Sequence, residues 1–218
     1  MKKENQKKCY GAVCFLTAFV LWTAAVRTVD VKAIGPQGST VGFAAVNRYV
    51  HSLTGVHMSL YTLTDWLSLI PLGFVMGFAL LGLGQWMRRK HLLKVDRSIL
   101  ILGGFYLVVM AAFLFFEKFV VNYRPVLIEG ALEASYPSST TMLVLCVMPT
   151  AIMQLNARIR NKAVRRCATF SLIAFMGFMV IARLVSGVHW FTDIVGGALL
   201  SAGLVMMYAS VSDLASNP

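Results

Sequence analysis

Six apolar runs constrain this chain more than any other feature of its sequence. Each is bounded by charged residues, glycine or proline, and they fall at about 10–27, 65–87, 99–116, 141–156, 168–186 and 192–211. A helix that crosses a bilayer needs about 20 mostly apolar residues, so six spans occupy most of a chain of 218 residues. We therefore predict an all-α, multi-pass membrane protein with a single membrane domain over residues 1–218.

The composition excludes other classes. The chain is 58% hydrophobic and 13% charged, whereas soluble domains average about 45–50% apolar and about 25% charged residues. An ordinary soluble enzyme and a disordered chain are therefore excluded.

The first apolar run follows a basic stretch, as in a signal peptide. No clean cleavage site follows it, and the run is long enough to span a membrane, so we expect a retained first helix.

The net charge of +11 reflects three short basic clusters. They hold fourteen of the twenty lysines and arginines: Lys2, Lys3, Lys7 and Lys8; Arg88, Arg89, Lys90, Lys94 and Arg97; Arg158, Arg160, Lys162, Arg165 and Arg166. Each cluster flanks an apolar run, as the positive-inside rule expects of cytoplasmic loops. This distribution predicts cytoplasmic N- and C-termini in a cell membrane and anionic lipids as partners of the cytoplasmic face, and argues against a nucleic-acid partner.

The fourth run is the weakest of the six. It is short and contains Pro149, which favours a kink inside a helix. We retain it as a span because removing it would place two basic clusters on opposite sides of the membrane.

The segment 39–53 has the pattern of an amphipathic helix. Its apolar residues recur at spacings of three and four with polar residues between them: Phe43, Val46, Val50 and Leu53 against Asn47, Arg48, His51 and Ser52. We predict an interfacial helix on the outer membrane surface, capped by Ser39 or Thr40.

The chemically capable side chains gather on the side opposite the basic clusters. Arg183 lies near the end of an apolar run, where an arginine is costly unless an anion or a carboxylate meets it. His189 and Asp193 are four residues apart at the start of the sixth run. On a helix this spacing places both on one face, where the carboxylate accepts the Nδ1–H of the imidazole and leaves Nε2 directed outward.

A phosphate site is indicated by the residues around this pair. Arg124 and Arg183 supply planar guanidinium groups suited to phosphate. Ser138 and Ser139 directly precede the fourth run, and the N–H groups at a helix N-terminus bind anions. The alternative, in which His189 and Asp193 merely cap a helix and the arginines extend to the membrane surface, explains each residue singly but not all of them together.

These residues resemble the motifs of the type-2 phosphatidic acid phosphatase superfamily, the six-helix membrane enzymes related to vanadium-dependent haloperoxidases. The family motifs read K-x6-R-P, P-S-G-H and S-R-x5-H-x3-D. This chain has N-Y-R-P at 122–125, P-S-S-T at 137–140 and A-R-x5-H-x3-D at 182–193. The order, the spacing and the side of the membrane agree, and the resemblance covers roughly residues 65–211, taken as the catalytic-type core.

The resemblance implies a role for each matching position. His189 would attack phosphorus and form a phosphohistidine, with Asp193 orienting it. Arg124, Arg183, Ser138 and the backbone near Ser139 would bind the phosphate oxygens. Water would then hydrolyse the intermediate. The resemblance implies no metal and no cofactor, since arginines supply the positive charge.

The chain departs from the family pattern at four positions. Thr140 stands where the family has the histidine that protonates the leaving oxygen. The family lysine falls on Glu117, with Lys118 one position later, which on a regular helix points about 100° away; we still include Lys118 among the candidate phosphate ligands. Ser139 and Ala182 replace the family's glycine and serine.

The missing acid favours one substrate class. A hydroxyl is a poor acid near neutral pH, and a diphosphate has a better leaving group than a lipid phosphomonoester. We therefore expect a lipid phosphatase that hydrolyses a lipid phosphate or diphosphate at the outer face, with a polyprenyl diphosphate favoured over a phosphomonoester lipid and with reduced activity. Two other interpretations remain: His51 or His57 donates the proton, or the protein binds or transfers phosphate-bearing lipids without catalysis. A haloperoxidase is the more remote alternative, because those relatives are soluble.

Overall fold

The computed structural model describes residues 2–216, and six stretches within them are long and apolar enough to cross a membrane. Five are single helices: α1 (Lys2–Thr28), α5 (Arg97–Lys118), α6 (Ser139–Arg158), α7 (Lys162–Val185) and α8 (Phe191–Ser216). The sixth joins α3 (Met58–Leu67) and α4 (Leu69–Arg89) into one span, Met58–Arg89. The prediction of an all-α protein with six spans is confirmed.

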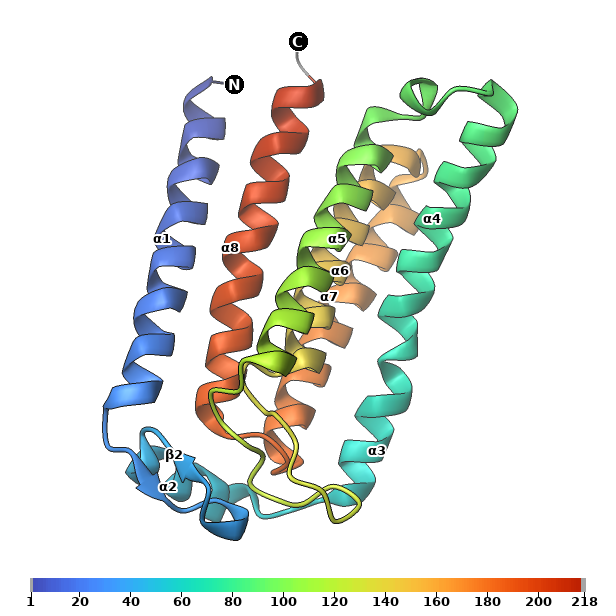
Figure 1. The fold of residues 1–218 in the computed structure, drawn as a ribbon. Helices are drawn as coiled ribbons and strands as arrows, with labels where there is room; N and C mark the ends of the chain where they lie inside the picture. Colours follow the sequence, from blue (N-terminus) through green and yellow to red (C-terminus); the bar gives the residue numbers. More distant parts are fainter. Residues whose placement is uncertain (1, 217–218) are drawn as a thin grey trace.

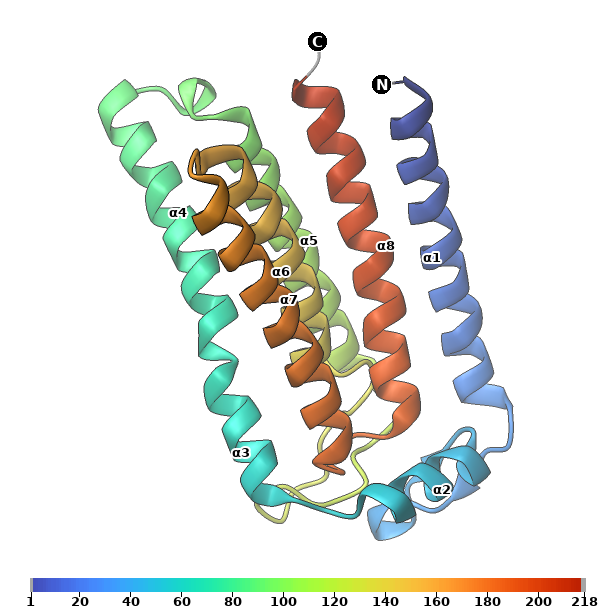
Figure 2. The same ribbon diagram turned by 180° about the vertical axis from the view of Figure 1, so that it is seen from behind.

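The two ends of the bundle differ in character (Figures 1 and 2). The start of α1, the end of α8 and the connections α4–α5 and α6–α7 lie at one end, which we call the terminal end. All three basic clusters belong to these segments, including the short 3-10 helix η2 (Leu92–Lys94). At the opposite end, which we call the loop end, lie α2 (Ala44–Thr54) and the long connection from α5 to α6.

The helix α6, whose sequence signal is the weakest of the six, lies at the centre of the bundle. In the most apolar window of α6, 56% of the residues are buried inside the protein, against 6% for the α3–α4 span and 22% for α5. The window of α8 is buried to the same 56% with a mean hydropathy of 1.9, whereas that of α6, at 1.4, is the lowest of the six. Burial therefore permits a less apolar span but does not require one. The helix continues through Pro149.

The first and last helices pack side by side at close range. A Cβ atom built on Gly11 of α1 would lie 2.2 Å from the Met206 side chain of α8, and one on Gly203 would lie 2.7 Å from Leu16. Small residues allow transmembrane helices to approach closely. These glycines therefore hold α8, whose first turn carries Asp193, against α1.

The predicted amphipathic helix exists, but it begins later than expected. Strands β1 (Lys32–Ala33) and β2 (Thr40–Val41) pair in a small antiparallel hairpin around η1 (Pro36–Gly38). Thr40 is therefore a strand residue and Ser39 ends the 3-10 turn, so the prediction that either caps the helix is wrong. The helix starts at Ala44, and Phe43 before it provides no side-chain cap.

The side of this helix that meets the protein also differs from the prediction. Asn47 was assigned to the polar, outward side, but its side chain is buried. Its amide donates to Thr192 Oγ1 at 3.0 Å, and its oxygen accepts from the Thr192 backbone N–H at 3.2 Å. Asn47 thus anchors α2 on the first turn of α8, while Val46 and Leu53 remain exposed.

Candidate active site

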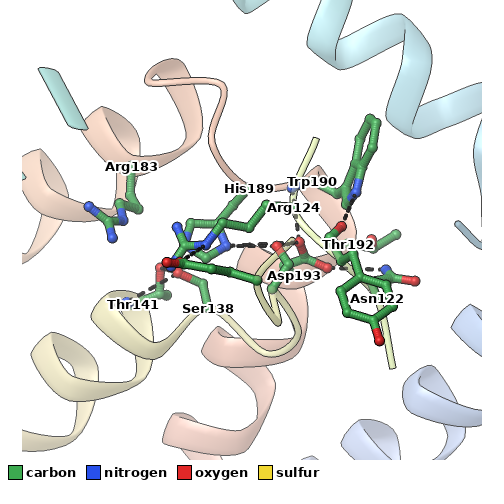
Figure 3. Close-up of polar contacts among 12 residues, drawn as sticks. Asn122, Arg124, Ser138, Thr141, Arg183, His189, Trp190, Thr192 and Asp193 are labelled. Atoms are coloured by element: carbon green, nitrogen blue, oxygen red, sulfur yellow. Dashed lines mark hydrogen bonds and ion pairs between the residues drawn. The ribbon is translucent and has the colours of Figure 1, made fainter. Parts of the chain in front are cut away.

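Most of the candidate residues meet at the loop end, where the connection from α5 to α6, the end of α7, the α7–α8 turn and the start of α6 converge (Figure 3). Arg124 comes from the 119–138 connection, and Ser138 caps α6. Arg183 lies near the end of α7, and His189 lies in the turn between α7 and α8. All four side chains are buried.

His189 precedes α8, which begins at Phe191, so the prediction that His189 and Asp193 share a helix face is wrong. The turn that carries His189 depends on Gly187, whose φ is +68°. A Cβ atom there would lie 1.8 Å from the carbonyl oxygen of Gly55. Only glycine permits this approach, which packs the turn against the segment between α2 and α3.

Asp193 is fixed by the first turn of α8. Its Oδ2 atom accepts the backbone N–H of Trp190 at 2.9 Å, the bond that an acidic residue in the first helical turn makes to the residue that caps the helix. Its Oδ1 atom accepts from the Asn122 amide at 3.2 Å. The carboxylate is fully buried, so its position is set from two directions.

The sequence pattern predicted a direct hydrogen bond between the Asp193 carboxylate and the His189 imidazole, and this prediction is wrong. Asp193 Oδ2 lies 3.9 Å from His189 Nδ1, which is beyond hydrogen-bond distance. The Ser135 hydroxyl contacts both groups, at 3.0 Å from His189 Nδ1 and 2.5 Å from Asp193 Oδ2. Ser135 was missed because it lies outside the motif residues, two positions before P-S-S-T.

Arg124 lies next to the other ring nitrogen of His189. Its Nη1 atom is 3.4 Å from His189 Nε2, and its Nε atom is 3.0 Å from the Glu133 carboxylate. The backbone N–H of Arg124 donates to the Glu133 carbonyl at 3.0 Å. The two sides of the 119–138 connection thereby place this guanidinium beside His189 Nε2.

Arg183 is held by residues of α3 that the sequence analysis missed. Its Nη1 atom donates to Thr64 Oγ1 at 2.9 Å, and its Nη2 atom lies 3.3 Å from Asp65 Oδ1. Its guanidinium carbon lies 4.5 Å from the centre of the Tyr61 ring, which Arg124 also faces at 5.7 Å. The one available signal was Asp65, an acidic residue at the edge of an apolar run.

The start of α6 combines a capping serine with two threonines. Ser138 Oγ accepts from the backbone N–H of Thr141 at 3.5 Å and from the Thr141 hydroxyl at 3.0 Å. Thr140 and Ser139 line a cavity of about 380 Å³, together with Asp65. Apart from Ser68 and Tyr106, the rest of the wall is apolar and comes mainly from α4, α5 and α6, as at Leu72, Val109 and Phe113.

Lys118 is not brought to the site. It is the last residue of α5 and is exposed, and we find no hydrogen bond or ion pair of its side chain within residues 2–216. Glu117 instead lines a small hollow with Ser135 and Ser139. The residue at the family's lysine position therefore brings a carboxylate near the site.

Burial lowers the pKa of the His189 imidazole well below its ordinary value, and the charges of Arg124 and Arg183 lower it further. The ring is therefore neutral, as a nucleophile must be. If the nucleophilic histidine had the ordinary pKa of about 6.5, the enzyme would lose activity as the pH fell through that value, because the ring would become protonated. Because the pKa of His189 is lowered, we expect kcat/KM to hold through pH 6.5 and to decline only at lower pH.

The pH profile of kcat/KM checks this expectation, after correction for the substrate's own phosphate ionisation, which also falls near pH 6. An acidic limb centred near 6.5 that the substrate does not account for would contradict a neutral, buried His189.

Comparison with known proteins identifies the family. The model of the PAP2 superfamily matches residues 101–215, which is more than half of the chain. The chain therefore belongs to the PAP2 superfamily, and this membership supports a membrane phosphatase acting on phosphoric esters. Within residues 2–216, no cluster of three or more His, Cys, Asp or Glu residues could hold a metal ion.

The fold agrees with that of a solved relative. The structure resembles the crystal structure described as the first transmembrane PAP2 type phosphatidylglycerolphosphate phosphatase from Bacillus subtilis, with a TM-score of 0.64 and 17% sequence identity. The match covers 94% of this chain and 97% of that chain. No curated protein sequence matches significantly. The chain is thus a multi-pass membrane protein with the PAP2-type fold.

Proposed function

We propose that this protein is a membrane lipid phosphatase that hydrolyses a lipid phosphate or diphosphate through a phosphohistidine on His189. The observation that carries this proposal is the position of His189 Nε2, 3.4 Å from Arg124 at the loop end. Asp65, which contacts Arg183, lines a largely apolar cavity there. Arg183 Nε is buried and lacks a hydrogen-bond partner among the described residues. An incoming phosphate oxygen would satisfy that donor.

The proposed reaction has two displacements at phosphorus. His189 Nε2 forms a bond to phosphorus while the bond from phosphorus to the leaving oxygen breaks. Arg124, Arg183 and the N–H groups at the start of α6 stabilise the charge on the other phosphate oxygens. Ser138 accepts two hydrogen bonds within α6, so its own proton remains free to donate to phosphate. Water then attacks phosphorus, releasing inorganic phosphate and free His189.

The cavity beside α4 and α5 supports a lipid substrate. Its polar end is formed by Asp65, Ser139 and Thr140, and its remaining wall is largely apolar. A second cavity of about 410 Å³ shares Val75 and Tyr106 with it and extends toward Trp86, near the terminal end. A tail could thus follow α4 over much of its length, as a long polyprenyl chain requires.

The substrate preference follows from Thr140. The solved relative is named for a lipid phosphomonoester, but this chain has a hydroxyl where the family has an acid. General acid catalysis raises the reaction rate about 10²–10⁴-fold. Hydrolysis of a phosphoanhydride needs it least, because its phosphate leaving group departs without first being protonated. We expect purified protein to release phosphate at least about tenfold faster from a polyprenyl diphosphate than from phosphatidate or phosphatidylglycerolphosphate. A phosphate-release assay over this panel checks it, and faster release from either monoester would contradict the preference.

We also propose that the site faces the outer leaflet, with both termini in the cytoplasm. The three basic clusters share the terminal end, opposite the site, and the positive-inside rule places that end in the cytoplasm. Anionic lipids of the inner leaflet would contact these clusters. A lipid headgroup can then reach His189 from the outer leaflet while its tail stays in the bilayer.

One observation favours the alternative of lipid binding without turnover. Both arginines already contact a carboxylate, Arg124 that of Glu133 and Arg183 that of Asp65. Glu117 adds a further carboxylate at the family's lysine position. If phosphate release is absent from wild type and from His189→Ala alike, while phosphate-bearing lipids still bind, the binding function is supported instead.

A further inference from the structure

We propose that Ser135 is a positioning residue of this site: its hydroxyl connects Asp193 to His189 and, together with Arg124, fixes which ring nitrogen carries the proton. The inference deepens the proposed function and rests on it for its catalytic consequence. It is carried by three distances among buried groups. They are 3.0 Å from Ser135 Oγ to His189 Nδ1, 2.5 Å from Ser135 Oγ to Asp193 Oδ2, and 3.9 Å from His189 Nδ1 to Asp193 Oδ2.

The direction of each hydrogen bond follows from what the groups can donate. A serine hydroxyl has one proton and two lone pairs. Asp193 already accepts from the Trp190 backbone and from Asn122, and as a carboxylate it can only accept from Ser135. The Ser135 proton is therefore committed to Asp193, and a lone pair of its oxygen is left to accept the Nδ1–H of His189.

The other side of the ring independently requires the same tautomer. An arginine side chain donates and does not accept, so the contact from Arg124 Nη1 at 3.4 Å requires a lone pair on His189 Nε2. A neutral imidazole has one N–H, which must then be on Nδ1. Ser135 and Arg124 thus both favour the tautomer in which Nε2 can attack phosphorus.

Ser135 also accounts for how a distant carboxylate assists the reaction. When Nε2 bonds to phosphorus, the ring becomes a cation that retains its Nδ1–H. The Ser135 oxygen accepts this stronger donor while its own proton stays hydrogen-bonded to Asp193. The negative charge of Asp193 therefore stabilises the cation through one intervening hydroxyl, and no proton needs to leave the chain of three groups.

The decisive measurement is the tautomer of His189, because it does not depend on turnover. Histidine-selective ¹⁵N labelling marks four rings, and the His189 signals are those lost in His189→Gln. We expect long-range ¹H–¹⁵N correlations to show a protonated Nδ1 and an unprotonated Nε2 in wild type. In Ser135→Ala, where the hydroxyl that accepts the Nδ1–H is removed while Arg124 still faces Nε2, we expect a changed Nδ1 ¹⁵N chemical shift. Wild type with its proton on Nε2, or an Nδ1 chemical shift that is unchanged in Ser135→Ala, would overturn the proposal.

Activity then tests the consequence. Replacing a residue that orients a reacting group commonly reduces activity about 10–100-fold, so Ser135→Ala should lower kcat by that factor. KM should change less than about twofold, because Ser135 is not a phosphate ligand. Ser201→Ala is the matched control, since Ser201 is equally buried but bonds to the Met142 carbonyl inside the bundle. It should leave kcat unchanged.

A double-mutant cycle separates positioning from general structural support. If Ser135 acts through Asp193, Ser135→Ala should reduce kcat no further when Asp193→Asn is already present. Two full, additive losses would contradict the connection. If wild type releases no phosphate from any lipid while the tautomer behaves as expected, the proposed function fails and the positioning role of Ser135 stands.

Discussion

Replacing His189 with alanine should reduce lipid phosphate release by about 10⁴-fold or more, to the background of the assay. The substitution removes the atom that bonds to phosphorus, and losing the nucleophile of a covalent mechanism abolishes nearly all catalysis. The arginines and the start of α6 would remain to bind the headgroup. Substrate binding should therefore persist in the variant, which a lipid-binding assay measures alongside phosphate release.

His91 offers the matched control for this substitution. It is an exposed histidine in the α4–α5 connection at the terminal end, far along the bundle from the site. His91→Ala should release phosphate at the wild-type rate. Activity that survives in His189→Ala would show that another group attacks phosphorus.

Replacing Thr140 with histidine should accelerate hydrolysis of a lipid phosphomonoester by about 10²–10⁴-fold, the usual range for general acid catalysis. Thr140 occupies the family's acid position and borders the 380 Å³ cavity, which leaves room for the larger side chain. Hydrolysis of a diphosphate lipid should change much less, because its leaving group needs protonation less. The ratio of the two rates, measured on one preparation, reports the effect.

Thr140→Asn controls for the change in size and polarity, since an amide cannot act as the acid. It should leave the monoester rate near that of wild type. If Thr140→His and Thr140→Asn behave alike, the absent acid does not limit turnover, and the argument for a diphosphate substrate loses its basis.

Local patterns in the sequence predicted most of the fold, because a membrane span is recognised from its own residues. The six spans were recognised from the length and hydropathy of each apolar run, and the helix α2 from the spacing of its apolar residues. The predicted start of α2 was wrong because Thr40 belongs to the β1–β2 hairpin, which forms by pairing between separate segments. The predicted outward orientation of Asn47 was wrong because its hydrogen-bond partner, Thr192, lies 145 positions away in the chain and no local pattern shows it.

The candidate site shows the same division between local and distant contacts. Arg124, Arg183, Ser138, His189 and Asp193 could be found from motif spacing, and the structure gathers them at one end of the bundle. The i, i+4 rule failed for His189 because it applies inside a helix and α8 begins two residues later. The α3 partners of Arg183, Thr64 and Asp65, lie 119 and 118 positions from it in the chain, so no local pattern could assign them.

The most direct test of the central claim is to trap the phosphorylated protein. Detergent-purified protein is mixed with a lipid diphosphate labelled in its terminal phosphate, and the reaction is quenched with alkali and separated under denaturing conditions. The phosphohistidine mechanism predicts a label on the protein that resists alkali, is lost in acid and maps to His189, and that is absent from His189→Ala. Phosphate release from the lipid with no labelled protein at early reaction times, or equal labelling of His189→Ala, would contradict it.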